Sequence, residues 1–280
     1  MVRLKIKKLS LPPIVIMFQK AKYILLSLYF LLPNKNFAQK NDLTSQEIKF
    51  TKLYSKVLSY PIENYDSLNY YAEKFENEFI GFIKNNPTTF DYPFKRIIDS
   101  NICWINTSND KNFRIYSWDT RTGGSMHIFK TIYQWKSNGK VFVNVPKYAE
   151  GDPGSFCSKI FTVIINNQPF YLAITNGIFS NKSMMQEIST FGIKGNKLVD
   201  TIKLFKTKTK KLNKISVEFD FFSVVDRPER PLELISYDEK KNIIYIPVVD
   251  NNGKVSNKNI LYQLKGSYFE FIGIETGKRK

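Results

Sequence analysis

Histidine is almost absent from this chain of 280 residues, because His127 is the only one. Any mechanism that needs an imidazole must therefore use that residue. A zinc site requires several His, Cys or carboxylate ligands, and one His with two Cys is a poor supply. Phosphate-loop and dinucleotide glycine fingerprints are missing as well. We therefore predict that the protein has no metal site and no cofactor.

A long apolar run is also missing. The run at 24–32 has nine residues, whereas a membrane-spanning helix needs about 20. Lys20 and Lys22 precede this run and Phe37-Ala38-Gln39 follows it, an order that is typical of an export signal. We predict a signal peptide at about residues 17–38, preceded by an N-terminal extension, and a periplasmic or secreted protein with no membrane span after its removal. The alternative is an N-terminal anchor helix.

Cysteine is scarce, with only Cys103 and Cys157. In an oxidising compartment an even number of cysteines favours a disulfide between them. A bond that closes a loop of this length would stabilise the fold by about 4 kcal/mol. The alternative is a pair of buried free thiols.

Acidic residues are outnumbered, since 25 Asp and Glu face 42 Lys and Arg, and the formal charge is +17. Residues 1–38 hold seven of the basic residues and no acid, so removal of the signal would lower the excess. The acids are interspersed among the bases along the rest of the chain. We therefore predict no nucleic-acid partner, and an envelope component or a glycan as the partner instead.

Helical periodicity marks residues 39–96. Apolar side chains recur at three- and four-residue spacings in 67–85, where Ser67 can cap the helix and Asn86-Pro87 ends it. A weaker helix is predicted over 45–58. From residue 97 to 280 the pattern changes to alternating, β-branched and aromatic segments separated by polar turns.

The strand-rich part contains a weak repeat. Segments 113–118, 170–175 and 243–248 are similar strands, and each is followed by a hairpin with a glycine turn, such as Asn138-Gly139. Further strands are predicted over 128–135, 160–165, 185–193, 198–205, 215–224, 232–237, 260–265 and 268–272. The fold class is therefore mainly β with an N-terminal helical segment, and the β domain is an antiparallel meander. It can close as a barrel, fold as a sandwich or remain an incomplete propeller.

Residues 114–127 read Arg-Ile-Tyr-Ser-Trp-Asp-Thr-Arg-Thr-Gly-Gly-Ser-Met-His. This segment resembles a motif of uncharacterised, exported, β-rich bacterial proteins of the Bacteroidetes type. No activity is known for that family. The resemblance implies export and a β-rich fold, and it transfers no site residue.

The same segment contains the candidates for catalysis, Asp119, Ser125 and His127. Ser125 and His127 would share one face of a strand, and Asp119 lies across a glycine turn, where it can orient the imidazole. The alternative is a turn whose polar side chains bond the backbone. A pair of carboxylates elsewhere is a further route to a secreted hydrolase.

Two groups of residues are candidates for binding. Trp118 and Trp135 can stack on a sugar or belong to the core. Lys206, Lys208, Lys210 and Lys211 form a basic run that can dock an anionic glycan, or can simply keep a hairpin tip solvated. We predict an exported, non-catalytic binding or structural protein, with a hydrolase as the alternative.

Overall fold

The structure is a computed structural model, which describes residues 35–226 and 233–276, with side chains from residue 42 onward. Most of the predicted signal peptide lies outside these residues, so the export signal remains a prediction. The chain divides into two compact units, Met1–Gln46 and Glu47–Lys280. All of the contacts below lie within the second unit.

Helices come first, as the periodicity predicts. They are α2 (Lys35–Ser59), α3 (Tyr65–Asn85), the 3-10 turn η1 (Pro87–Phe90) and the short α4 (Lys95–Asp99). The predicted cap is wrong: Asn64, not Ser67, precedes the first turn of α3, and its side chain makes no capping hydrogen bond. The helix ends before Pro87, because proline cannot continue the hydrogen-bond ladder.

An aromatic cluster joins the helices to the sheets. Phe79 of α3 is fully buried, and its ring centroid lies 5.3 Å from that of Phe50 in α2 and 5.4 Å from that of Phe75. On its other side it lies 6.1 Å from the ring of Tyr116 and 5.7 Å from that of Trp118. The predicted boundary between residues 96 and 97 therefore divides helices from strands, but one aromatic core extends across it.

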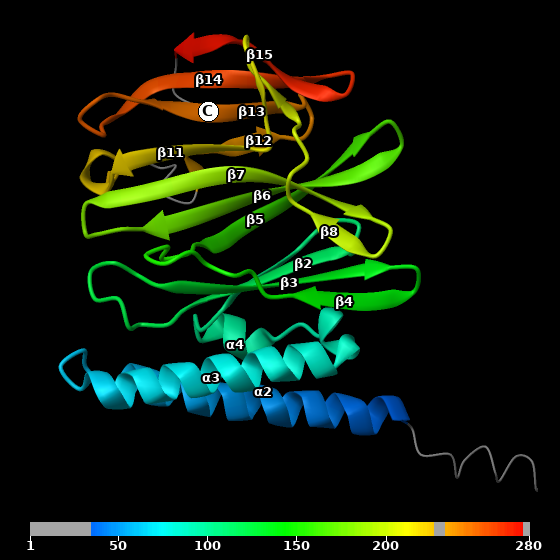
Figure 1. Cartoon of the computed structure of the whole chain (residues 1–280), viewed down its shortest axis with the longest axis vertical. Helices are drawn as coiled ribbons and strands as arrows, with labels where there is room; N and C mark the ends of the chain where they lie inside the picture. Colours follow the sequence, from blue (N-terminus) through cyan, green and yellow to red (C-terminus); the bar gives the residue numbers. More distant parts are fainter. Residues whose placement is uncertain (1–34, 227–232, 277–280) are drawn as a thin grey trace, which may run out of the picture. The chain divides into compact units, whose positions relative to one another are not determined.

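The strands form three sheets, which lie on one another in Figure 1. The first sheet consists of β1 (Trp104–Thr107), β2 (Phe113–Asp119), β3 (Phe129–Ser137) and β4 (Lys140–Asn144). The second sheet consists of β5 (Phe156–Ile165), β6 (Gln168–Ile178), β7 (Ser183–Lys194), β8 (Lys197–Val199) and β11 (Lys214–Asp220). The third sheet consists of β9 (Phe205–Lys206), β10 (Lys211–Leu212), β12 (Ser236–Asp238), β13 (Ile243–Val249), β14 (Val255–Lys265) and β15 (Tyr268–Thr276).

The repeat in the sequence corresponds to three four-stranded antiparallel meanders: β1–β4, β5–β8 and β12–β15. The second sheet is covered on both faces, so side chains of successive residues in β6 pack into different hydrophobic cores. Tyr171 packs against the first sheet, whereas Leu172 belongs to the core shared with the third sheet. The structure thus confirms the mainly β, antiparallel class, and the stacked meanders resemble propeller blades without a closed ring.

The predicted strand over 198–205 is wrong, because the chain crosses between two sheets there. β8 pairs with β7 in the second sheet, whereas β9 pairs in parallel with β15 in the third. Between these strands Leu204 enters the core that the two sheets share. The predicted strand over 215–224 is also shorter, since a 3-10 turn η2 (Phe221–Ser223) follows β11. The spacing of apolar residues predicts that a segment is a strand, but it does not predict which sheet the segment joins.

The predicted disulfide is not formed, since Cys103 and Cys157 are both free and buried. Cys103 directly precedes β1, and its Sγ lies 3.6 Å from the carbonyl oxygen of Trp104. Cys157 lies in the core between the first and second sheets. The two thiols therefore have different neighbours, and no disulfide joins them.

We expect both thiols to resist alkylation in the folded protein. Burial raises the pKa of the Cys157 thiol to about 12 and also raises that of Cys103, so little reactive thiolate exists at neutral pH. A thiol titration should count no fast-reacting group in buffer and two groups in denaturant without reductant. A count of zero in denaturant would show that the disulfide forms after all.

Candidate functional site

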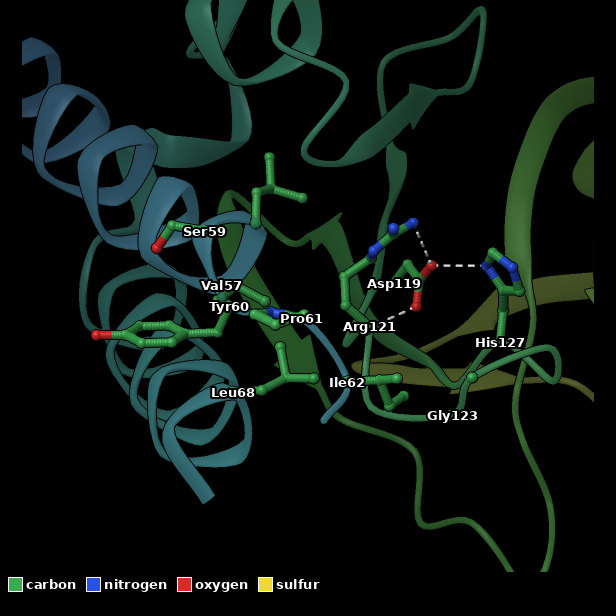
Figure 2. Close-up of a pocket in the computed structure, with 12 residues that line it drawn as sticks. Val57, Ser59, Tyr60, Pro61, Ile62, Leu68, Asp119, Arg121, Gly123 and His127 are labelled. Carbon is green, nitrogen blue, oxygen red and sulfur yellow. Dashed lines mark hydrogen bonds and ion pairs between the residues drawn. The ribbon is translucent and has the colours of Figure 1, made fainter. Parts of the chain in front are cut away.

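A pocket of about 540 Å³ opens between the α2–α3 connection and the β2–β3 loop (Figure 2). One wall is mostly apolar and comes from the end of α2, the connection and the start of α3. The other wall is polar and comes from the end of β2 and the loop that follows it. The residues of the two walls are Val57, Leu58, Ser59, Tyr60, Pro61, Ile62 and Leu68, and Asp119, Arg121, Gly123, Gly124 and His127.

The polar wall is organised around the carboxylate of Asp119. Its Oδ2 lies 2.7 Å from Nδ1 of His127 and 3.7 Å from a guanidinium nitrogen of Arg121. Its Oδ1 accepts a hydrogen bond of 2.8 Å from the backbone N–H of Arg121. The Asp119 side chain is 8% exposed, against 31% for His127 and 50% for Arg121. A nearly buried carboxylate thus presents an imidazole and a guanidinium to the pocket.

Backbone contacts fix both ends of this loop. The hydroxyl of Tyr54 in α2 donates a hydrogen bond of 2.6 Å to the carbonyl oxygen of Asp119. Burial, and then the charge of Asp119, raise the pKa of Tyr54, so the phenol stays a donor. At the other end, the N–H of His127 donates to the carbonyl oxygen of Ile178 in β6. The pair of Asp119 and His127 is therefore held by a helix and by the second sheet.

The backbone conformation of the loop restricts which residues can occupy two of its positions. Arg121 has a φ of 66°, a left-handed conformation that costs a non-glycine residue of this kind about 1 kcal/mol. At Gly123 an added Cβ would lie 1.9 Å from the carbonyl oxygen of Met126. The loop can therefore keep this path only without a side chain at Gly123.

We expect Gly123→Ala to lower the free energy of unfolding by about 1–3 kcal/mol, because the loop backbone must shift to relieve the clash. Gly81→Ala is the matched control. It adds the same methyl group in α3, where nothing lies within 4 Å, and should stabilise the helix by up to about 1 kcal/mol. Urea unfolding followed by circular dichroism measures both changes. Equal effects of the two substitutions would contradict the tight path of the loop.

The structure brings together two of the three predicted catalytic residues. Asp119 and His127 are hydrogen-bonded, but Ser125 is exposed and does not line the pocket. In the part of the chain that the structure describes, no serine hydroxyl is hydrogen-bonded to the imidazole. Ser125 lies in a turn rather than a strand, so the spacing of two residues does not place it beside His127. Ser59 lines the pocket, but its hydroxyl bonds the carbonyl oxygen of Lys56 instead.

The predicted stacking surface of tryptophans is wrong. Trp118 and Trp135 are 1% and 6% exposed. Trp118 contacts the rings of Phe75 and Phe79 beneath the helices, and Trp135 belongs to the core between the first and second sheets. Both faces of the first sheet are covered, so neither indole can reach a glycan.

The basic run lies on the β9–β10 hairpin, and most of its lysines have partners. Lys206 forms an ion pair of 2.8 Å with Glu270, Lys211 bonds the hydroxyl of Tyr268, and Lys208 lies over the ring of Phe271. Lys210 is exposed. Among the described residues, none of the large exposed apolar side chains is an aromatic of this region. The rings of Tyr268 and Phe271 beside the hairpin are half-buried and lie under Lys211 and Lys208, so the lysines occupy the faces on which a sugar would stack.

Periodicity and motif reading missed the apolar wall and Arg121. Val57 and Leu58 lie in the helix predicted over 45–58 and Leu68 lies in that predicted over 67–85, but the connection between the helices, with Pro61 and Ile62, has no regular pattern. Its one indication in the sequence is the concentration of apolar residues on either side of Pro61 in a segment that is too short to form an element.

Within residues 35–226 and 233–276, no cluster of three or more His, Cys, Asp or Glu is placed to hold a metal ion. No helix in this part is long and apolar enough to cross a membrane. Compared with known proteins, the chain matches no family model and no curated protein sequence. The resemblance of residues 114–127 to exported bacterial proteins therefore remains a prediction.

Proposed function

We propose that this chain is an exported, non-catalytic binding protein, in the periplasm or secreted, and that the pocket between the α2–α3 connection and the β2–β3 loop is its ligand site. The observation that carries the proposal is the contrast between the two walls. Apolar side chains of Leu58 and Ile62 oppose the polar side chains of Asp119, Arg121 and His127. A concave site with apolar lining and a few converging polar groups is the usual form of a small-ligand site.

Exposed apolar side chains on the same two segments support this assignment. Leu58 is 56% exposed, Ile62 44%, Tyr65 51% and Met126 38%. Leu58 and Ile62 line the pocket, whereas Tyr65 and Met126 lie on the adjoining parts of the two segments. A group of exposed apolar side chains at a pocket is typical of a binding site. The backbone of Arg121 adds to the argument, because left-handed non-glycine residues concentrate at functional sites.

A hydrolase is the second candidate, and the hydrogen bond of 2.7 Å between Asp119 and His127 favours it. If Nδ1–H donates to the carboxylate, the neutral imidazole has a lone pair on Nε2 and can take a proton from a water molecule. Water would then be the nucleophile in place of Ser125. Asp119 is the one carboxylate among the described residues that line this pocket, so a pair of carboxylates is not available there.

A ligand screen by thermal shift on the exported protein tests the binding proposal. Compounds that raise the melting temperature should lose their effect in Leu58→Asp, which places a charge on the apolar wall. Ile164→Asp is the matched control, since Ile164 is 59% exposed on β5 and does not line the pocket. Compounds that stabilise both variants equally would show that the pocket is not the binding site.

Assays with chromogenic esters distinguish the second candidate. Turnover that disappears in His127→Gln and persists in Ser125→Ala would establish a hydrolase that uses water as its nucleophile. Binding without turnover would leave the non-catalytic function.

A further inference from the structure

We propose that the pocket binds a monoanionic amphiphile of the fatty-acid type, with its carboxylate on Arg121 and its alkyl chain on the apolar wall. This inference rests on the proposed function, because it names the chemical class of the ligand for the same pocket. It follows from three features of the pocket: the cation that remains open, the position of the exposed apolar groups, and the orientation of the aromatic ring in the wall.

Arg121 provides the open cation. Its guanidinium group is half exposed, and its single ion-pair contact with Asp119 is long, at 3.7 Å. Most of its five N–H donors therefore face solvent or the pocket, and a guanidinium binds a carboxylate through two parallel hydrogen bonds. In Figure 2 its side chain stands between the apolar wall and His127. A head group bound there would lie at the junction of the two walls.

Asp119 does not offer the opposite charge to a ligand. Its carboxylate is 8% exposed and is already bonded to Nδ1 of His127 and to the backbone N–H of Arg121. A cationic head group would have to displace these partners and would meet the charge of Arg121 first. An anionic head group can instead bind the guanidinium of Arg121 without displacing any of these partners. The charges of the site therefore favour an anionic ligand.

Exposed apolar groups mark the course of the alkyl chain. Leu58 lies in the last turn of α2 and Ile62 in the connection that follows, and both line the pocket. Met126 lies in the opposite β2–β3 loop, outside the lining. The connection and this loop approach at Gly124, where an added Cβ would lie 3.8 Å from a methyl group of Ile62. An alkyl chain along this rim would cover side chains that are now in water, and burial of each CH₂ is worth about 0.8 kcal/mol. Met126 is flexible enough to adjust to chains of different length.

Orientation of the aromatic ring argues against a sugar. Tyr60 is the aromatic residue in the lining, and its ring is stacked on Tyr71 with a centroid distance of 5.5 Å and an interplanar angle of 10°. In Figure 2 the Tyr60 ring points away from Arg121 and His127. Its stacking surface is therefore used on the helix side, and the polar wall receives no aromatic platform.

Calorimetric titration at neutral pH with octanoate, octanol and octylamine tests the class. We expect octanoate to bind at least about tenfold more tightly than the other two. Affinity should rise about three- to fourfold for each CH₂ between butanoate and octanoate. Arg121→Gln should remove the preference for the carboxylate, and Arg121→Lys should retain part of it, because lysine keeps the charge without the planar fork. Arg96→Gln, the same change at an exposed arginine of α4, should have no effect.

Three results would overturn the inference. Tighter binding of octylamine or octanol would show that the head group is not an anion, while the pocket would still be a ligand site. Unchanged octanoate affinity in Arg121→Gln, with a circular dichroism spectrum like that of the parent, would remove Arg121 as the head-group site. If neither these amphiphiles nor any compound of the ligand screen binds, both the class and the binding function fail.

Discussion

Phe79→Ala should lower the free energy of unfolding by about 3–5 kcal/mol, the usual cost of removing a fully buried phenylalanine. Phe79 is 0% exposed, and its ring lies between those of α2 and those of the first sheet. Its removal leaves a cavity where five aromatic rings meet, four of them edge-to-face with Phe79 and that of Phe75 stacked on it. These rings cannot fill the cavity without giving up their favourable packing geometry. The five rings are those of Phe50, Phe75, Phe94, Tyr116 and Trp118.

Urea unfolding monitored by circular dichroism measures this loss. Tyr70→Ala is the matched control, because Tyr70 belongs to the same helix but is 57% exposed, and its substitution should change stability by about 0.5 kcal/mol or less. Tryptophan fluorescence of Phe79→Ala should also shift to longer wavelength, since Trp118 loses part of its cover. A loss below about 1 kcal/mol would mean that the helices do not depend on this residue for their packing on the first sheet.

Arg114→Met should destabilise the fold by about 3 kcal/mol, an effect that the sequence does not suggest for a residue within an alternating strand. Arg114 is 5% exposed, and its Nη1 donates to the carbonyl oxygens of Thr89, Phe90 and Tyr92 at 3.0, 2.6 and 2.8 Å. Hydrogen bonds from a charged donor contribute about 1.5–3 kcal/mol each, and they are not additive. Methionine keeps much of the side-chain volume but cannot donate a hydrogen bond to the carbonyl oxygen of Phe90.

The control separates the buried donor from the loss of a positive charge. Arg96→Met makes the same chemical change at an exposed position of α4 and should cost about 0.5 kcal/mol or less. Arg114→Lys should fall between the two, because a single ammonium group cannot replace the fixed geometry of the guanidinium. If Arg114→Met proved as stable as Arg96→Met, the three carbonyl contacts would carry no net stability.

These two buried residues connect the fold to the pocket. Arg114, Tyr116 and Trp118 face the helices from β2, and Asp119, the last residue of that strand, begins the polar wall. The same packing holds α2 in place, and α2 provides both Tyr54 and the start of the apolar wall. The two walls of the pocket are therefore fixed by one aromatic core.

The sequence alone determined the local structure well. The apolar spacing over 67–85 predicted α3, because a helix buries one face at that period. Asn138-Gly139 predicted the β3–β4 hairpin, where both residues have positive φ, 50° and 71°, as the turn requires. The three similar segments of the repeat became β2, β6 and β13, the second strands of the three meanders, although the prediction was a single antiparallel meander. All of these features depend on residues that are neighbours in the chain.

Tertiary structure alone decided which residues meet. Cys103 and Cys157 are an even pair that permits a disulfide, yet both are free and buried, and Cys157 belongs to the core between the first and second sheets. Trp118 and Trp135 have the composition of a sugar platform, yet both faces of their sheet are covered. The prediction placed Asp119 near His127, and the two are hydrogen-bonded because one loop joins them. It also included Ser125, and it placed Val57 and Leu58 in a helix without predicting the pocket that they line. Alternation and spacing describe what a residue does within its own element, whereas a pocket depends on how separate elements pack, and packing is a property of the whole chain.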